Sequence, residues 1–412
     1  MTRNWNLVTE RDTATAPPPR RRRSRANELQ IQVERILERS RLAVVYAGKK
    51  NAAGAVINET ANLRPWKSYE TVAHDIAGAL GRLGCRHVAV IPEDMRLGER
   101  LRDEGIHMVW LNSGGVQGYD SVAHGAAMLE MFGIPYIGHA PLAAALLDNK
   151  YMFKRLLTAS GIPTAPCIVW QPGDERFQPD ASFQFQWAFK DWTGEFIVKP
   201  VSGRASLHVH HVASRKELAG IIESVQELTG GSVLVEGYLP GREYCVAVCG
   251  HVIRRNGMLE RNDGPFAFAC VERVLGEDEK VFTSMDVSPI TTDRLRMLLA
   301  ADDADIVARL HMLARQVFNE SGLETLIRLD VRMGADGELY VLEGNPKPDL
   351  KAPQENMTSI ICAGIAHEGM SFDDLIFSLL ADKVDLMFAE RRPSVKPLAE
   401  LAELAHNIVQ NR

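Results

Sequence analysis

Long hydrophobic runs, abundant cysteine and a strong excess of one charge are all missing from this sequence. No stretch of 18 or more residues is apolar, so no segment is predicted to span a bilayer. The N-terminus has no apolar segment of the signal-peptide type, and six scattered cysteines in 412 residues indicate reduced thiols rather than a disulfide framework. With 47 Lys and Arg against 53 Asp and Glu, the net charge of −6 argues against a nucleic-acid coat. We therefore expect a cytoplasmic protein that binds neither nucleic acid nor membranes.

The composition predicts a folded protein with an unfolded N-terminal segment. Apolar residues make up 46% of the chain and charged residues 24%, and the length corresponds to roughly two to four domains. The first 26 residues contain consecutive prolines and an arginine-rich run but little apolar sequence, which predicts a solvated tail. Binding of an acidic partner, or targeting, is the alternative role for this tail. Leu29, Val33, Ile36 and Leu37 then share one helical face, so a short amphipathic helix should follow.

Strands and helices alternate in the next part of the chain. Short apolar runs at 42–46, 87–91 and 108–111 suit buried parallel strands, and residues 69–83 have a helical pattern. This alternation predicts an α/β fold with helices packed on a mostly parallel sheet. Further on, the pattern predicts a helix through Lys150 that ends near 160, a long loop at 171–192, strands at 196–199, 207–212 and 232–236, and helices at 217–228 and 372–380.

The most informative segment is a predicted hairpin over residues 326–345. Asp336-Gly337 is a strong signal for a two-residue turn, and with that turn opposed residues have numbers that sum to 673. Side chains alternate along each strand, so a single face of the ribbon carries both polar pairs. These pairs are Asp330 with Glu343, and Arg328 with Asn345.

The two opposed carboxylates of this hairpin need a positive charge nearby. At a separation of about 5 Å and an effective dielectric of about 20 they repel by about 3 kcal/mol. One or two divalent cations held by oxygens of Asp330, Glu343 and Asn345 would offset this repulsion. Arg328 and Arg332 could instead neutralise the pair as a surface network. The spacing of the residues leaves both readings open.

Other charged positions supply the remaining parts of a nucleotide site. Lys199 ends a predicted strand and is followed by a short loop with Gly203, an arrangement that can present a lysine and backbone N–H groups to phosphates. Lys150 lies at a predicted helix start, and Glu236 and Glu243, seven residues apart, flank a flexible connector. Two lysines for phosphates, two carboxylates for amine and hydroxyl groups, and a metal hairpin together indicate an ATP site.

In this order and spacing, the residues resemble the ATP-grasp superfamily and, within it, the D-alanine–D-alanine ligases, over about residues 115–380. The motifs that carry the resemblance are residues 129–138, Asp148-Asn149-Lys150, residues 197–200, the pair Glu236 and Glu243, and the set Asp330, Glu343 and Asn345. The resemblance implies an α/β fold, α+β in parts, with an N-terminal parallel-sheet domain, a central lid domain and a C-terminal metal-binding domain. The expected segments are a basic tail plus short helix at 1–40, the N-terminal domain at 41–141, the lid domain at 142–231, the catalytic domain at 232–383 and a tail at 384–412.

The resemblance also implies a role for each matching position. The phosphates of ATP would be held by Lys150 and Lys199, adenine recognised by Glu236, Tyr238 and Leu239, ribose by Glu243, and two Mg²⁺ (or Mn²⁺) ions by Asp330, Glu343 and Asn345. Arg328 would stabilise the acyl phosphate and the tetrahedral intermediate, and Arg204 in the lid loop would contact phosphate. The implied reaction transfers the γ-phosphoryl group to a carboxylate, after which an amine displaces phosphate to form an amide.

Both substrate ends differ from the family pattern. Lys67 and Ser68 stand near the position of the glutamate that receives the donor ammonium in the D-alanine enzymes. The acceptor loop carries Lys347 and Lys351 ahead of an insertion. We therefore expect a ligase of specialised metabolism, for example of the mycosporine type, that joins a small carboxylate and an amine; a homodimer is compatible with this expectation. The alternatives are a D-alanine–D-alanine ligase and, outside enzymes, an ATP-binding regulatory protein.

Two remaining groups are assigned structural roles. His208 and His210 fall on one face of a predicted strand, and no suitable Cys or carboxylate lies near enough in sequence to complete a zinc site, so strand filling or lid contacts are favoured. Cys245 and Cys249 have the same strand parity and are expected to be buried core thiols.

Overall fold

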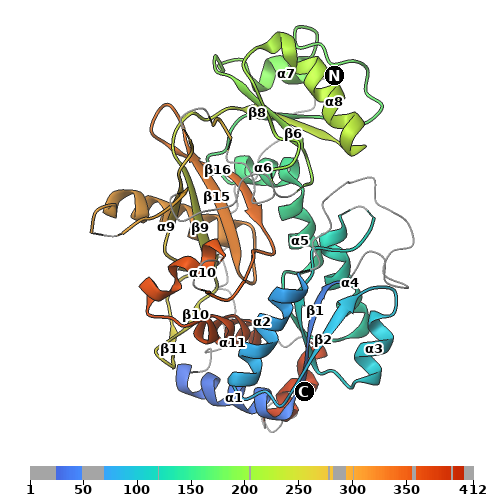
Figure 1. Cartoon of the computed structure of the whole chain (residues 1–412), viewed down its shortest axis with the longest axis vertical. Helices are drawn as coiled ribbons and strands as arrows, with labels where there is room; N and C mark the ends of the chain where they lie inside the picture. Colours follow the sequence, from blue (N-terminus) through green and yellow to red (C-terminus); the bar gives the residue numbers. More distant parts are fainter. Residues whose placement is uncertain are drawn as a thin grey trace, which may run out of the picture.

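The computed structural model describes residues 25–48, 69–118, 120–203, 206–276, 279–281, 294–299, 301–354, 359–390 and 393–402. Three sheet-centred units follow one another along the longest axis of the molecule, as Figure 1 shows. A four-stranded antiparallel sheet lies at the top, a larger antiparallel sheet lies in the middle, and a parallel sheet lies at the bottom. Within the described ranges, no helix is both long and apolar enough to cross a membrane.

The N-terminal unit is the predicted parallel α/β layer. Its strands pair in the order β2-β1-β3-β4, all parallel. The strands are β1 (Arg41–Ala47), β2 (His87–Glu93), β3 (Met108–Asn112) and β4 (Tyr136–Ile137), and the helices are α1 (Ala26–Arg39), α2 (Glu70–Arg82), α3 (Leu97–Asp103) and α4 (His124–Phe132). The four apolar residues predicted to share one face of α1 are all buried, as the periodicity required.

The central unit contains the lid sheet. Its strands pair in the order β5-β8-β6-β7, all antiparallel, and α8 (Leu218–Thr229) packs on β6. The strands are β5 (Cys167–Trp170), β6 (Phe196–Pro200), β7 (His210–Val212) and β8 (Val233–Gly237).

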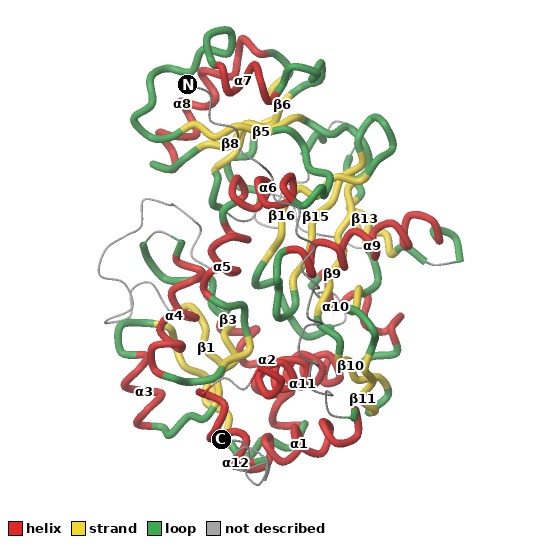
Figure 2. Tube along the Cα trace, turned by 180° about the vertical axis from the view of Figure 1, so that it is seen from behind, coloured by secondary structure: helices red, strands yellow, loops and turns green. Residues whose placement is uncertain are grey.

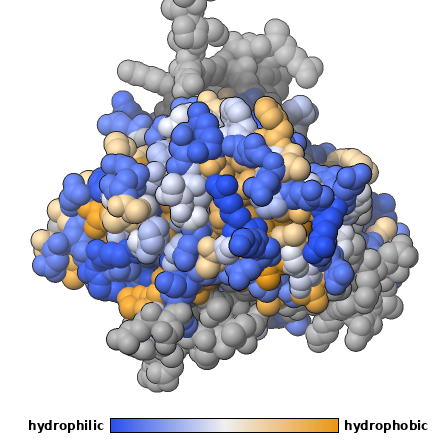
Figure 3. Space-filling view, turned by 90° about the horizontal axis from the view of Figure 1, so that it is seen from above, coloured by the Kyte–Doolittle hydropathy of each residue, from blue (hydrophilic) through white to orange (hydrophobic). Residues whose placement is uncertain are grey.

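Seen from above, the described surface is mostly hydrophilic with scattered apolar residues (Figure 3).

Two local predictions in the central unit are wrong. Residues 171–192, expected to form a loop, contain α7 (Phe183–Ala188), and the rings of Phe177, Phe185 and Phe189 are buried in the core of this unit. The aromatic side chains therefore supply a core that the irregular polar pattern concealed. The strand expected from 207 begins only at 210, because Ser206 and His208 adopt positive φ angles of 50° and 56°. His208 consequently lies outside the strand, so it does not share a strand face with His210.

The C-terminal sheet is antiparallel and carries the predicted hairpin at its edge. Its strands pair in the order β14-β13-β9-β15-β16, and β12 also pairs with β9. The strands are β9 (Glu243–Cys249), β12 (Phe266–Ala267), β13 (Val271–Arg273), β14 (Leu295–Met297), β15 (Ile327–Met333) and β16 (Leu339–Asn345), with a separate hairpin of β10 (Val252–Arg255) and β11 (Met258–Arg261). Helix α9 (Ala304–Glu320) packs against β9. Cys245 and Cys249 on β9 are free and buried, as predicted.

Helices and strands cross the expected domain boundaries. Strand β8 is hydrogen bonded within the lid sheet, so the pairing favours a boundary after Gly237 rather than at 231/232. Helices α5 (Pro141–Asp148) and α6 (Lys150–Ala159) contribute apolar residues to the core of the C-terminal sheet. Connecting segments thus pack on neighbouring units, and the packing favours a lid segment that begins later and ends later than the expected 142–231.

Helix α11 joins the C-terminal part of the chain to the N-terminal unit. It runs over Phe372–Glu390, past the expected helix end at 380 and the expected boundary at 383, and is buried on nearly all sides. It packs against α1, α2 and β10, as Figures 1 and 2 show from opposite sides. The short helices α10 (Ile360–Gly364) and α12 (Lys396–Leu401) also contribute to this shared core.

Candidate active site

The hairpin β15–β16 brings Asp330 opposite Glu343 and Arg328 opposite Asn345, as the sequence predicted. The route to this register differs from the prediction. Near the turn, Met333 pairs with Leu339, and a three-residue loop closes with Gly337 at a φ of 79°. A bulge between the two regions, at Leu342, adds one residue to β16 and restores the predicted pairing at the carboxylates.

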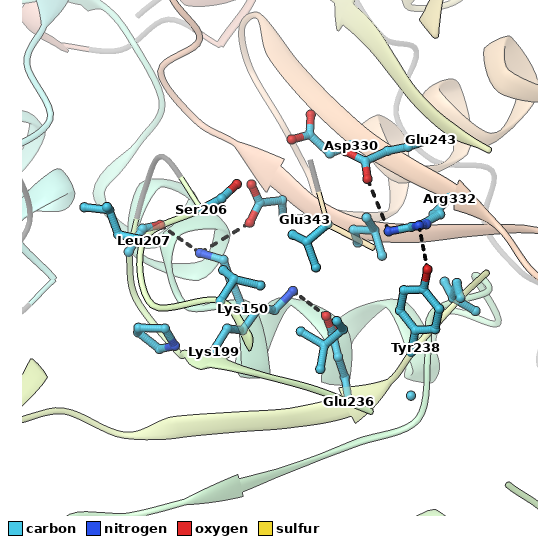
Figure 4. Close-up of a pocket in the computed structure, with 18 of the residues that line it drawn as sticks. Lys150, Lys199, Ser206, Leu207, Glu236, Tyr238, Glu243, Asp330, Arg332 and Glu343 are labelled. Atoms are coloured by element: carbon cyan, nitrogen blue, oxygen red, sulfur yellow. Dashed lines mark hydrogen bonds and ion pairs between the residues drawn. The ribbon is translucent and has the colours of Figure 1, made fainter. Parts of the chain in front are cut away.

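This hairpin forms one wall of a cleft against the lid sheet. The empty space of the cleft is about 760 Å³, a volume that includes open solvent. Figure 4 shows the charged side chains from both units pointing into it. The predicted residues that line the cleft are Lys150, Lys199, Glu236, Tyr238, Leu239, Glu243, Asp330 and Glu343. The fold therefore gathers all six predicted nucleotide residues and two of the three predicted metal ligands.

Lys150 links the loop after β6 to the hairpin β15–β16. It is the first residue of α6, whose N-cap Asn149 accepts a hydrogen bond from Met152 N at 3.0 Å. Its Nζ donates to the backbone O of Gly203 at 2.8 Å and lies 3.3 Å from a carboxylate oxygen of Glu343. One ammonium group thus holds the loop that follows β6 and the carboxylate on β16 at the same point (Figure 4).

Lys199 is paired within the lid sheet. Its Nζ lies 2.5 Å from Glu236 Oε1, and both side chains are buried. Burial alone would lower the pKa of Lys199, but the charges of Glu236 and Glu343 raise the pKa above its ordinary value. The ammonium is therefore charged at neutral pH and lies at the cleft wall, where a phosphate oxygen could accept from it.

A second buried lysine, Lys154, holds the other oxygen of Glu236. Its Nζ lies 2.9 Å from Glu236 Oε2 and donates to Thr164 Oγ1 at 2.7 Å. Burial would raise the pKa of Glu236, but the two lysines outweigh it and hold that pKa at about 2. Sequence reasoning missed Lys154; its place on the same helix face as Phe153 and Leu157, both buried, was the available signal.

Glu236 is therefore a counter-ion for two lysines in this structure. The adenine role that the resemblance implies for it requires one of its oxygens, or the adjoining backbone, to remain available. The connector after β8 is better placed for contact with adenine. Tyr238 and Leu239 line the cleft there, and the backbone N–H of Tyr238 donates to Glu195 O at 2.9 Å. The ring of Tyr238 contacts the guanidinium of Arg332 at 4.9 Å, which fixes its orientation.

Arginines surround the carboxylates at the base of the cleft. Arg328 donates to Asp330 through Nε at 2.8 Å and Nη2 at 3.0 Å, and Arg273 donates to the same carboxylate at 3.2 Å. Arg273 also donates to Glu243 at 2.8 Å, while Arg332 lies 3.5 Å from Glu243. Burial would raise the pKa of Asp330, but Arg273 and Arg328 hold it well below the ordinary value. Arg273 is a cleft residue that the sequence analysis did not identify.

The repulsion predicted for the hairpin pair is offset by cations on both sides. Asp330 is neutralised by Arg328 and Arg273, and Glu343 by Lys150. Arg332, expected to take part, faces Glu243 and Tyr238 instead. Positively charged side chains thus neutralise both carboxylates within the described structure. A metal ion bound here would have to share the carboxylates with these side chains.

The donor set nevertheless fits Mg²⁺ in its chemistry. Asp330 and Glu343 are directly opposed carboxylates, and Asn345 follows two residues along the strand, so hard oxygen donors share one end of the hairpin. The Asn345 amide nitrogen faces Arg328 O at 3.5 Å, which points its amide oxygen elsewhere. Among the described residues, no group of three or more His, Cys, Asp and Glu could hold a metal, so the hairpin offers two carboxylates and one amide.

The predicted substrate residues are placed only in part. Lys347 lies directly after the metal hairpin, with its Nζ 3.1 Å from the ring centroid of Tyr69 at the start of α2. Lys351 follows in the same loop, where the N–H of Ala352 donates to Asp75 at 3.0 Å. This loop therefore meets the N-terminal unit, and neither Lys347 nor Lys351 lines the cleft. Lys67, Ser68 and Arg204 lie outside the described residues.

Comparison with known proteins gives the family. Residues 156–381, more than half of the chain, match the family model of the D-ala D-ala ligase C-terminus. The chain belongs to this family. A D-alanine–D-alanine ligase of Synechococcus sp. (strain JA-3-3Ab) is 26% identical to this ligase over 331 residues, which cover 77% of the chain and 92% of the relative.

Solved structures share the fold of this ligase. A D-alanine–D-alanine ligase from Bacillus anthracis in complex with ATP superposes with a TM-score of 0.60 at 17% identity, covering 85% of this chain and 98% of that one. The VanG D-Ala:D-Ser ligase from Enterococcus faecalis superposes with a TM-score of 0.56 at 18% identity, covering 84% and 99%. The predicted resemblance and fold class are thereby confirmed: this is an ATP-grasp ligase that forms carbon–nitrogen bonds. Ligases of this family use ATP and Mg²⁺.

Proposed function

We propose that this ligase joins two molecules of D-alanine through an acyl phosphate, with release of ADP and phosphate. The observation that carries the proposal is that Lys150 and Lys199 line the same cleft as the opposed carboxylates Asp330 and Glu343. Such a site suits a polyphosphate bridged by Mg²⁺, since phosphoryl transfer depends mostly on positioning and electrostatic stabilisation.

The residues would divide the work as follows. Lys150 and Lys199 would bind the phosphates, and Glu243 would accept from ribose hydroxyls. Asp330, Glu343 and Asn345 would hold two Mg²⁺ ions, which would neutralise charge on the phosphates. A substrate carboxylate oxygen attacks the γ-phosphorus, and the bond to the β,γ-bridging oxygen breaks. The amine of the second substrate then attacks the acyl carbon, loses a proton, and phosphate leaves. Arg328, held in place by Asp330, would stabilise the oxyanion of the tetrahedral intermediate.

The choice of D-alanine follows the relatives rather than the sequence expectation. We expected a specialised ligase of the mycosporine type, and the relatives give that substrate class no support. The curated relative described above is named as a D-alanine–D-alanine ligase, and the match covers 92% of its length. Nearly the whole length of a D-alanine enzyme is thus represented in this chain, which favours the alternative reading.

A second candidate substrate is favoured by one specific observation. The Nζ atom of Lys347 is buried at 3.1 Å from the Tyr69 ring centroid, and Asn112, at the end of β3, lies 3.4 Å from the backbone O of Tyr69. An ammonium group is thereby placed where the acceptor loop meets the carboxyl edge of the parallel sheet. A substrate with an additional carboxylate would suit this position, and Lys351 lies in the same loop.

The test measures ATP-dependent phosphate release and identifies the product by mass spectrometry. We expect D-alanine alone to support turnover and to yield D-alanyl-D-alanine. Glu343→Gln should abolish phosphate release, since it removes a metal carboxylate opposite Asp330. Glu338→Gln is the matched control, because Glu338 lies in the same hairpin but is exposed and pairs with Arg309 at 3.3 Å.

Each alternative outcome has a defined meaning. Release that requires a dicarboxylic amino acid, and that is lost in Lys347→Met, would establish the second candidate. Turnover that is equal in the wild type and Glu343→Gln would contradict the metal assignment. Absence of turnover with every amino-acid pair, despite ATP binding, would favour a regulatory nucleotide-binding protein and refute the ligase reaction proposed here.

A further inference from the structure

Arg273 occupies the position between two carboxylates that bind different parts of ATP in the proposed function. It ends β13 and is directly opposite Glu243 on β9, and β9 lies between β13 and β15. Its side chain reaches across β9 to Asp330 on β15. A single nitrogen, Nη1, donates to Glu243 Oε1 at 2.8 Å and to Asp330 Oδ2 at 3.2 Å.

We propose that Arg273 is a phosphate-binding residue that holds Glu243 and Asp330 in the nucleotide-free protein and transfers to the phosphates when ATP binds. The inference rests on the proposed function, because it takes Glu243 as the ribose ligand and Asp330 as a metal ligand. It assigns a role to Arg273, which lies outside the sequence motifs, and it adds a change of hydrogen-bond partners when ATP binds.

The charge balance at the base of the cleft favours an anionic ligand. Asp330 already receives two hydrogen bonds from Arg328, and Glu243 has Arg332 at 3.5 Å. Arg273 is therefore a third guanidinium beside two carboxylates, and its side chain is only 11% exposed. Three buried cations with two anions leave one positive charge in a site of low dielectric, which favours an anionic ligand.

ATP and its metal ion would compete with Arg273 for the same carboxylate oxygens. Ribose hydroxyls that donate to Glu243 would compete with Nη1 at Oε1. A divalent cation on Asp330 would compete at Oδ2 and would repel the guanidinium. Both parts of Mg²⁺–ATP therefore displace Arg273 from its present acceptors. The polyphosphate arrives in the same step and is the new anion in the cleft, so it is the natural acceptor for the displaced guanidinium.

The residue next to Arg273 on β13 has arginine partners with a structural role. Glu272, the residue before Arg273, receives hydrogen bonds from Arg242 Nε at 2.5 Å and from Arg296 Nε at 2.7 Å. Neither of these arginines lines the cleft, and both are partly exposed at 48% and 43%. Arg296→Gln is therefore the matched control for a loss of positive charge near β13 without a change in the cleft.

The experiment compares the affinities of ATP and adenosine for the full chain in the presence of Mg²⁺, by isothermal titration calorimetry. Arg273→Gln should weaken ATP binding by about 10- to 100-fold, the expected loss of a charged hydrogen bond. Adenosine binding should be unchanged or tighter, because Glu243 is released. Arg273→Lys should retain part of the ATP affinity, and it serves as the test variant if the glutamine variant does not fold. Arg296→Gln should leave both affinities at wild-type values.

The outcomes separate this inference from the proposed function. Equal weakening of ATP and adenosine by the Arg273 variants would mean that the residue only positions Glu243, and would overturn the inference. Unchanged ATP affinity in both variants would overturn it as well. Wild-type protein that binds no ATP would refute the proposed function itself. If the wild type binds ATP, the variants test only the role of Arg273.

Discussion

Replacing Lys154 by methionine tests the buried charge cluster behind the cleft. Lys154 is fully buried, with Glu236 Oε2 at 2.9 Å and Thr164 Oγ1 at 2.7 Å from its Nζ. The lysines hold the pKa of Glu236 at about 2 instead of 4.5, which corresponds to roughly 3 kcal/mol of stability. Methionine keeps the length of the side chain and removes the charge. We expect the variant to lose about 2–4 kcal/mol at pH 7, since Glu236 is left with Lys199 as its charged partner.

The sign of the pH dependence follows from the direction of the shift. A carboxyl whose pKa is lowered by folding stabilises the protein above its unfolded pKa of 4.5, and this contribution is lost as the pH falls toward about 2. In Lys154→Met the pKa of Glu236 should lie nearer to 4.5. The difference in stability between wild type and variant should therefore shrink as the pH falls from 4.5.

Urea unfolding at several pH values, followed by tryptophan fluorescence, measures this difference. Trp170 and Trp192 pack against the core of the lid sheet and report on the unit that contains Glu236. Lys190→Met is the control, because that side chain is 70% exposed and lies 3.7 Å from Asp191 at the surface. A difference that is below about 1 kcal/mol, or that stays constant from pH 7 to pH 3, would refute the charge argument.

Three further predictions concern other parts of the molecule. Chelation of divalent ions should abolish ATP-dependent phosphate release, and added Mg²⁺ should restore it, if the hairpin carboxylates hold the metal. Gly250→Ala should destabilise the protein by about 1–3 kcal/mol and lower the thermal unfolding temperature, because the added Cβ would overlap the carboxylate of Asp382. Gly264→Ala, with open space around it, should not. Burial raises the pKa of Cys270 and Cys362 to about 12, so these thiols should react slowly with a disulfide reagent at pH 8, and rapidly in urea; fast reaction in the native protein would contradict their burial.

The hairpin illustrates how far the sequence reaches. Its alternation, its Asp-Gly signal and the pairing of Asp330 with Glu343 were all predicted correctly, because strand periodicity acts locally. The loop was predicted one residue too short, and the bulge at Leu342 compensated for this error at the carboxylates. A bulge depends on the twist and packing of the whole sheet, which no local pattern of residues expresses.

The residues that the sequence analysis missed have partners far away in the chain. Arg273 acts across β9, on Glu243 and on Asp330, which is 57 residues away. Lys154 finds its counter-ion in Glu236, on a strand of another unit. Periodicity can place a charge on a buried helix face, but the identity of its counter-ion is decided by tertiary packing. The motif residues were predictable because their order along the chain carries the resemblance.

The position of α11 has a consequence for synthesis of the protein. This helix begins at Phe372, yet it packs against α1 and α2, which are among the first elements of the chain. While the chain grows from its N-terminus, the parallel sheet and its helices exist for more than 200 residues of elongation without the helix that completes their core. Apolar residues such as Val33 and Ile76 share that core with Leu380 and Val384, so this part of the core forms only after residues 372–384 have been synthesised. The N-terminal unit is thus made before the helix that completes its core, and in the meantime it exposes apolar surface of the kind that promotes aggregation.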